Sequence, residues 1–289
     1  MLKRLINLFG SLAVAAADRI GRLIGRLLNR VPRPTCVVLA YHAVQDSQRQ
    51  QFASQMDELV RRAIPVRADI ASLSDQKGAR YAAVTFDDGL HNVVLNALPE
   101  LEKRHIPSVL FIVTEVLGGH PEWEYFGGDD PSKELAMSAQ TLKKLPSDLV
   151  VIGSHSMTHP VLPSLHRQQM LDELAGSRAK LEKLLNREVK LFSFPYGAFD
   201  ERVIAVCKEV GYERVFTALP VTAFSQAHEF VTGRVGVNPT DWPIEFRLKL
   251  AGAYRWLPYA YLVKRRILSA LRGQRIPQVT LKPEQKRVA

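Results

Sequence analysis

Short apolar runs alternate along the chain with longer stretches in which apolar residues recur every three or four positions. The runs predict buried strands over 36–42, 82–86, 107–113, 149–154, 189–194 and 214–218. The periodic stretches predict helices over 93–105, 141–145 and 167–185, and from Asp200, the expected N-cap, to Val210. Residues 114–137, rich in Gly, Pro and acidic side chains, predict a long loop. Alternating strands and helices predict a parallel sheet with helices outside it, closed or nearly closed into a barrel.

The first thirty residues have the period of a helix with two unlike faces. Basic residues recur at steps of three and four, and apolar residues fill the other side; the basic set is Arg19, Arg22, Arg26 and Arg30. No window of this segment reaches about 18 uncharged apolar residues, which argues against a transmembrane helix. We favour a basic helix on a membrane interface, at the cytoplasmic face. Two alternatives stay open: a signal peptide ending near 15–17, which would make the protein secreted or periplasmic, and a surface helix packed on its own domain.

Proline and charge patterns divide the rest of the chain. Pro32 and Pro34 predict a linker after the first helix. Residues 246–271 predict a second basic amphipathic helix with interleaved aromatic residues, suited to a membrane interface or to a helical cap over the barrel. The remaining tail is expected to be disordered. We therefore expect three regions: a helix and linker over 1–34, an α/β domain over 35–245, and a basic aromatic region with its tail over 246–289.

The net charge of +10 is unevenly distributed. Residues 1–34 hold seven Lys or Arg and one acid, and residues 247–289 hold eleven and one. The segment between them carries 21 basic and 27 acidic side chains, a net charge of −6. A nucleic-acid-binding fold would carry its basic patch on the core, so that class is excluded, and the basic ends favour an anionic membrane surface. The two cysteines are too few for a disulfide framework.

Two adjacent carboxylates, Asp87 and Asp88, follow a predicted strand and precede a glycine. Like charges this close repel and raise each other's pKa, so a compensating cation is expected. The alternative interpretation is a turn, because Asp-Gly is a common turn dipeptide. His155 and His159 follow another strand at a spacing that predicts two imidazoles on one side of a helical turn. Two histidines and an acid from neighbouring strand ends make a set of three metal ligands.

The segments "TFDDG", "SHSMTH" and "SFPYG" each stand at the end of a predicted strand. They resemble the first three motifs of the polysaccharide deacetylases, also called carbohydrate esterase family 4 or NodB-homology domains, over roughly residues 36–240. The resemblance implies a distorted (β/α) barrel that holds Zn²⁺ or another divalent ion and removes acetyl groups from an N-acetylated glycan. The strand end "VLAYH" is similar to that of a subset of the family that deacetylates exopolysaccharides and biofilm polymers.

The motif match implies roles for individual residues. Asp88, His155 and His159 would hold the metal, and Asp87 would be the general base for the attacking water. The backbone N–H of Tyr196 would stabilise the oxyanion. Substrate contacts are expected from four residues: Pro195, Tyr196, Leu162 and Trp123. The sequence is equally consistent with Leu162 as a core residue. It is equally consistent with Trp123 as a side chain that covers the mouth of the barrel.

Two positions depart from the family pattern. Most relatives protonate the leaving amine with a histidine from a strand near the C-terminus, and no such strand follows Gly197. We expect His42 to be this general acid, because the first and last strands of a closed barrel are neighbours; the alternative is a structural histidine. Many relatives carry an arginine at the position of Ser193. We expect Arg234 to supply that charge to Asp87 from another strand; the alternative is a surface arginine.

Together with the metal-ligand set and the basic ends, the family resemblance favours a metal-dependent hydrolase that removes N-acetyl groups from a cell-envelope or extracellular polysaccharide, or from its lipid-linked precursor. An O-acetyl esterase or a deformylase acting on a lipid-linked sugar would use the same site and stays open. A non-catalytic carbohydrate-binding protein is disfavoured, because such a protein is expected to have a broken ligand set and this one is complete.

Overall fold

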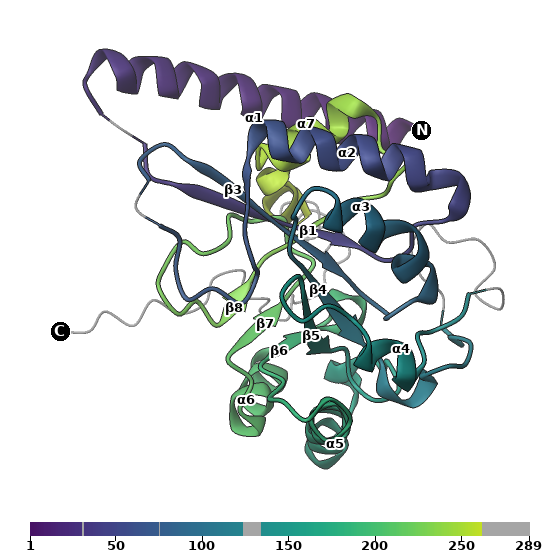
Figure 1. The fold of residues 1–289 in the computed structure, drawn as a ribbon. Helices are drawn as coiled ribbons and strands as arrows, with labels where there is room; N and C mark the ends of the chain where they lie inside the picture. The colour runs from purple at the N-terminus through teal and green to yellow at the C-terminus, as the bar shows by residue number, and fades with distance from the viewer. Residues whose placement is uncertain (31, 75, 124–133, 262–289) are drawn as a thin grey trace.

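The computed structural model describes residues 1–30, 32–74, 76–123 and 134–261 (Figure 1). Nine strands in this part of the chain form one sheet, with the order β8-β7-β6-β5-β4-β3-β1-β9 and β2 beside β3. They are β1 (Thr35–Tyr41), β2 (Ile64–Pro65), β3 (Arg80–Phe86), β4 (Ser108–Ile112), β5 (Val150–Ser154), β6 (Leu191–Ser193), β7 (Arg214–Phe216), β8 (Val231–Thr232) and β9 (Val235–Gly236). All these pairings are parallel, which confirms the predicted sheet.

The sheet curls nearly into a barrel. At one edge β8 pairs with β7, and at the other β9 pairs with β1. Only Gly233 and Arg234 separate β8 from β9 in the chain. This dipeptide therefore spans the seam between the two edges and brings the last strands beside the first.

Successive side chains of the strands belong to two different hydrophobic clusters. Leu39 of β1 and Val84 of β3 pack with helical residues such as Phe52. Their neighbours Val38 and Ala83 belong to the cluster inside the curled sheet. Because both faces are buried, the strands are apolar along their whole length, as is typical of parallel sheets.

Helices surround the sheet (Figure 1). Those described are α1 (Leu2–Leu27), α2 (Arg49–Arg62), α3 (Leu98–Glu102), α4 (Ala139–Lys143), α5 (Arg167–Leu185), α6 (Glu201–Val210) and α7 (Pro243–Leu250). The predicted helix 93–105 begins as a π-helical segment and continues as α3. The predicted cap of α6 is confirmed, because the Asp200 side chain accepts a hydrogen bond from the Val203 N–H at 3.0 Å.

The described part of the helical region expected from residue 246 is helical, but it is interrupted. The helix α7 begins at Pro243 and ends at Leu250, and Gly252 then adopts a left-handed conformation with φ 70° before a 3₁₀ turn over Ala253–Trp256. Phe246 is buried in the main core, so this part of the chain packs against the barrel. The boundary expected at residue 245 falls inside α7. Residues 262–271 and the tail expected to be disordered lie outside the described residues.

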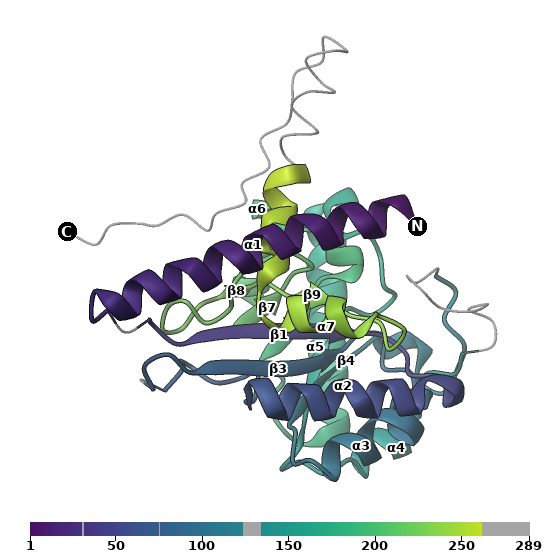
Figure 2. The same ribbon diagram turned by 90° about the horizontal axis from the view of Figure 1, so that it is seen from above.

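The predicted helix at the start of the chain is confirmed as α1, which extends along one side of the molecule (Figure 2). It contacts α7 and the 3₁₀ turn over Ala253–Trp256. Among the described residues, no helix is both long and apolar enough to cross a membrane.

Candidate metal and catalytic site

The carboxyl ends of neighbouring strands gather the predicted site residues. Asp87 and Asp88 follow β3, His155 follows β5, and His42 follows β1. The sheet continues for one residue past β3, because the Asp87 N–H donates to the Tyr41 carbonyl at 2.9 Å. Parallel strands place these ends at one edge, where α/β barrels carry their chemistry.

Backbone conformation is unusual at this edge of the sheet. Four non-glycine residues of the site region adopt positive φ: Asp88 (68°), Ser156 (70°), His159 (60°) and Tyr196 (57°). Such conformations cost about 1–3 kcal/mol each and cluster at sites where side-chain direction matters. The two metal-ligand candidates in this set are therefore turned inward by strained backbone that the surrounding fold must stabilise.

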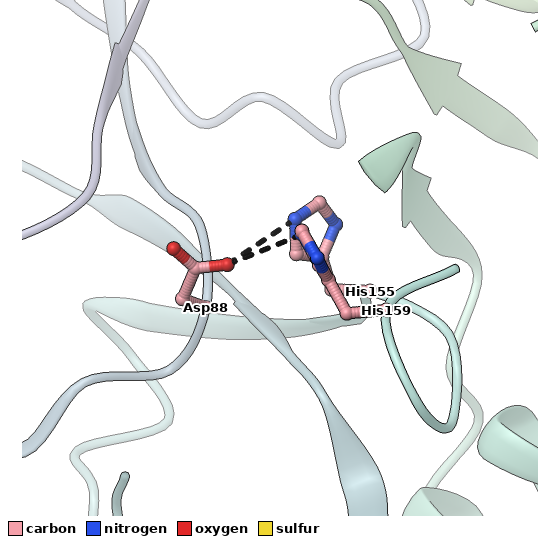
Figure 3. Close-up of side chains that lie close together, drawn as sticks. All are labelled: Asp88, His155 and His159. Atoms are coloured by element: carbon pink, nitrogen blue, oxygen red, sulfur yellow. Dashed lines mark ion pairs between the residues drawn. The ribbon is translucent and has the colours of Figure 1, made fainter. Parts of the chain in front are cut away.

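Asp88, His155 and His159 form a compact group of potential metal ligands (Figure 3). Their ligand atoms all lie within 4.8 Å of one another, and all three residues are buried. The Asp88 Oδ1 atom is 3.6 Å from His155 Nε2 and 3.5 Å from His159 Nε2, too far for hydrogen bonds. Both carboxylate oxygens of Asp88 are buried without a hydrogen-bond partner among the described residues. A buried carboxylate without a partner is costly, so this donor set fits a cation.

A hydrogen bond at Nδ1, the ring nitrogen away from Asp88, fixes the orientation of His155. Its Nδ1 atom is 2.8 Å from the backbone carbonyl of Ser193, which accepts a hydrogen bond from the protonated Nδ1. This leaves the Nε2 lone pair facing Asp88 and His159, the arrangement that metal-binding histidines show. Burial lowers the pKa of His159 to about 2, so its imidazole is neutral at physiological pH. Both histidines are thus suited to donate lone pairs to a metal.

The predicted helical turn around these histidines is wrong. Residues 155–159 form an irregular loop, in which positive φ at Ser156 and His159 redirects the chain. Glu173 of α5 holds this loop, because its carboxylate accepts hydrogen bonds from the N–H groups of Met157 (2.8 Å) and Thr158 (3.0 Å). In a helix these N–H groups would donate to backbone carbonyls along the helix axis. Here they donate to the Glu173 side chain of α5 instead.

The predicted partnership of Arg234 and Asp87 is present in the structure. Arg234 Nη1 donates to Asp87 Oδ1 at 2.8 Å, and Nη2 donates to Oδ2 at 2.7 Å. The guanidinium also donates to the hydroxyls of Thr85 (3.1 Å) and Ser193 (2.7 Å) and to the Thr217 carbonyl (3.3 Å). Arg234 is 2% exposed, so it is not a surface arginine. Ser193, the position at which the family resemblance implies an arginine, accepts a hydrogen bond from Arg234 through its hydroxyl.

The two adjacent carboxylates have opposite pKa shifts. Burial raises the pKa of Asp87, but the Arg234 guanidinium outweighs burial and holds that pKa well below its usual range. Burial is the largest effect on Asp88, and the negative charge of Asp87 adds to it, so the pKa of Asp88 is raised. Protein side chains therefore satisfy one carboxylate fully and leave the other dependent on a cation.

His42 lies beside both aspartates. In the parallel register Tyr41 is opposite Phe86, which places His42 next to Asp87 at the strand ends. Its charge lowers the pKa of both Asp87 and Asp88. The side chain is partly exposed, so it lies at the border between the site and solvent.

The expected substrate-contacting residues lie in different surroundings. The ring of Trp123 stacks on His159 with centroids 4.4 Å apart, and the ring of Tyr196 meets His159 edge-on at 4.6 Å. Pro195 is buried, whereas Tyr196 is 46% exposed. Leu162 is completely buried in the main hydrophobic cluster, as its core interpretation predicts.

Three residues that contribute to the site were not predicted: Glu173, Thr85 and Thr217. Thr85 interrupts an apolar strand, which is a signal that a buried hydroxyl has a partner. Glu173 carries no such signal, because its spacing along α5 is that of an ordinary surface acid.

Comparison with known proteins agrees with this geometry. The family model described as polysaccharide deacetylase matches residues 74–215. YxkH of Bacillus subtilis is 22% identical over 212 residues, which are 70% of this chain and 71% of YxkH. The peptidoglycan-N-acetylmuramic acid deacetylase PdaA of the same organism is 30% identical over 134 residues, which are 46% of this chain but only 44% of PdaA. The structure of IcaB from Ammonifex degensii matches with a TM-score of 0.63 and 26% identity, over 76% of this chain and 97% of IcaB.

The curled parallel sheet and the strand-end residues define a hydrolase of the NodB-homology class, and the chain belongs to the polysaccharide deacetylase family. As a member of this family it is a hydrolase of carbon–nitrogen bonds other than peptide bonds. The expected (β/α) fold is confirmed.

Proposed function

We propose that this protein is a metal-dependent N-deacetylase acting on an N-acetylated cell-envelope or extracellular polysaccharide, or on its lipid-linked precursor. One observation carries the proposal: buried Asp88 faces two histidines and lacks a hydrogen-bond partner among the described residues, while adjacent Asp87 is ion-paired with Arg234. Asp88 would thus be a metal ligand, whereas the adjacent carboxylate of Asp87 would remain available for proton transfer.

Asp88, His155 and His159 would hold the metal, and two imidazoles with one carboxylate are a ligand set typical of zinc. Another divalent transition metal would suit the same donors. When bound, such an ion supplies a Lewis acid that acidifies water and polarises the substrate carbonyl. Three protein ligands leave coordination positions open for this chemistry.

The chain's own residues supply the proton transfers. Asp87 stays ionised because Arg234 lowers its pKa, so its carboxylate can accept a proton from the attacking water. The backbone N–H of Tyr196 would donate to the oxyanion that forms on the substrate carbonyl. His42, partly exposed beside Asp87, would donate a proton to the leaving nitrogen. Trp123 and Tyr196, whose rings contact His159, would contact the sugar, and Pro195 and Leu162 remain candidates for further substrate contacts.

The proposed substrate class is an exopolysaccharide of the biofilm type. Two observations support it: a histidine ends the first strand beside the site, and the fold matches that of IcaB over most of both chains. In this arrangement His42 supplies the acid that other relatives take from a strand near the C-terminus.

Acetate release from oligomers of N-acetylglucosamine tests this function. The purified full chain should release acetate in the presence of Zn²⁺, and the Asp87→Asn variant should lose this activity while keeping its metal. The exposed neighbour of Glu173 provides a matched control, Asp172→Asn, which should behave as wild type. Acetate release only from an O-acetylated glycan without N-acetyl groups would contradict N-deacetylation and favour the esterase alternative.

A further inference from the structure

The helix α1 is attached to the barrel by polar side chains. Arg4 Nε donates to Glu245 Oε1 of α7 at 2.8 Å, Trp256 Nε1 donates to Ser11 Oγ at 3.0 Å, and Arg255 Nη1 donates to Asp18 Oδ2 at 2.8 Å. Arg4, Ser11 and Asp18 are seven residues apart, which places them on one stripe of the helix. The side of α1 that faces the protein is thus fixed by three polar contacts.

The opposite side of α1 is apolar and exposed. We call it the outer face; it consists of Leu2 (73% exposed), Ile6 (54%), Phe9 (66%), Ile20 (57%), Leu23 (53%) and Leu27 (84%). An amphipathic helix of a globular protein usually buries its apolar stripe in the core. In α1, a helix of 26 residues, Leu8 and Val14 pack against the core, but a second apolar face stays exposed. An apolar surface of this extent marks a site of interaction.

Unpaired positive charges flank the outer face. Lys3, Arg19 and Arg26 are exposed and make no ion pair with any residue in the described part of the chain. A cleft of about 630 Å³ lies between the second half of α1 and the starts of β1 and β3, and Arg22 and Arg80 line it. Burial and the charge of Arg22 lower the pKa of Arg80. Positive charge thus remains in excess around the second half of α1, where Asp18 is already paired with Arg255.

We infer that the outer face of α1 binds the surface of an anionic lipid bilayer. Its apolar side chains would enter the acyl boundary, and the flanking Lys and Arg side chains would contact lipid phosphates. Tyr259 and Tyr261, 58% and 65% exposed, follow the 3₁₀ turn that packs on α1 and have the character of interfacial anchors. A second copy of the chain is a poorer occupant, because face-to-face packing would bring the unpaired cations of both copies together.

The contacts also define how the barrel lies relative to this bilayer. Arg4 donates to the Thr240 carbonyl just beyond β9, whereas Gly25 and Leu28 share the cleft with the start of β1. The helix α1 therefore runs antiparallel to β1, along the side of the barrel (Figure 2). A bilayer on the outer face would lie alongside the strands, with the site at the end of the barrel nearest to Met1.

Vesicle co-sedimentation of the full chain tests the inference without any use of activity. Wild type should bind vesicles of phosphatidylglycerol and phosphatidylcholine in about equal parts, and should bind pure phosphatidylcholine far less. The double variant Phe9→Gln, Leu23→Gln should bind at least about tenfold more weakly, because two large apolar side chains no longer enter the bilayer. The matched control Val60→Gln, Leu95→Gln changes two exposed apolar residues on other elements (41% and 55% exposed) and should bind as wild type.

Circular dichroism and sedimentation velocity on the same proteins complete the test. Equal binding by wild type and the α1 variant, with both folded, would overturn the inference for this helix. Absence of wild-type binding to anionic vesicles would overturn it as well. A wild-type dimer that the α1 variant converts to a monomer, without vesicle binding, would show that a second copy covers the outer face instead.

Discussion

At the residue scale, the contrast between Asp87 and Asp88 explains how adjacent carboxylates coexist in a buried site. Arg234 forms a bidentate ion pair with Asp87, whereas both oxygens of Asp88 lack a hydrogen-bond partner among the described residues. A guanidinium matches a carboxylate with two parallel hydrogen bonds, which an ammonium group cannot do. The chain thus satisfies one charge itself and leaves the other for a metal.

The first prediction concerns Arg234→Lys. If Asp87 is the general base, it acts only when ionised, so activity should be lost as pH falls through its pKa, which Arg234 depresses. Lysine cannot reproduce the bidentate pair, so this pKa should rise and the acid limb of the kcat/KM profile should move to higher pH. We also expect kcat/KM at neutral pH to fall by at least about tenfold. An acid limb at the wild-type position would contradict the assigned role.

A second prediction concerns His42→Asn. If His42 protonates the leaving nitrogen, kcat should fall by about 10²–10⁴-fold, because general acid catalysis typically contributes this much. Metal content should be unchanged, since His42 does not belong to the three-residue ligand group. The exposed His228 provides the control His228→Asn, which should keep full activity. Near-normal turnover of His42→Asn would favour its alternative role as a structural histidine.

At the element scale, α5 holds the loop that carries the histidines. Glu173 accepts hydrogen bonds from the backbone of Met157 and Thr158, and the Thr158 hydroxyl donates to the same carboxylate at 2.7 Å. These contacts lie between His155 and His159 in the chain. The helix α5 therefore positions the two candidate ligands without contributing one.

The third prediction follows for Glu173→Gln. The neutral amide is a weaker acceptor and presents a donor group to backbone N–H groups, so the loop should loosen. Metal affinity should fall by about 10–100-fold, the usual effect of altering groups behind metal ligands. Competition with a chelator measures this affinity, and Asp172→Asn on the same helix is the control. Unchanged affinity, with α5 intact by circular dichroism, would show that the loop does not need Glu173.

Individual elements also show what sequence patterns can and cannot predict. The helix α5 and the cap of α6 were predicted because periodicity and N-cap chemistry are local signals. The helix α2 was not predicted, although Phe52, Met56 and Leu59 have helical spacing. The loop 155–159 was predicted as a helical turn because its conformation depends on α5, a contact that sequence spacing does not reveal.

At the scale of the whole molecule, the seam of the barrel brings the parts of the site together. Arg234 lies between β8 and β9 and reaches Asp87 beyond β3, which is 147 positions away in the chain. Sequence resemblance suggested this pairing, but only closure of the sheet places the two residues in contact. The candidate metal ligands, in contrast, come from short motifs at the ends of single strands, and the structure places them close together.

The fourth prediction tests this seam through Gly233→Ala. A Cβ atom there would lie 2.2 Å from Val221 Cγ2 and 2.5 Å from the Leu219 carbonyl oxygen, so the backbone must move. We expect a loss of about 1–3 kcal/mol in the free energy of unfolding. Activity should fall as well, since Arg234 is the next residue. The same change at Gly236, whose added Cβ has no neighbour within 4 Å, should have a much smaller effect.

The central claim is that Asp88, His155 and His159 hold a catalytic divalent metal. The most direct measurement is the zinc content of the purified full chain, of Asp88→Asn and of the control Asp172→Asn, after equilibration with the same limited concentration of Zn²⁺. We predict about one zinc per chain in wild type and control, and almost none in Asp88→Asn, because loss of the anionic ligand leaves two neutral imidazoles. Equal zinc in all three proteins, or none in wild type, would contradict the account.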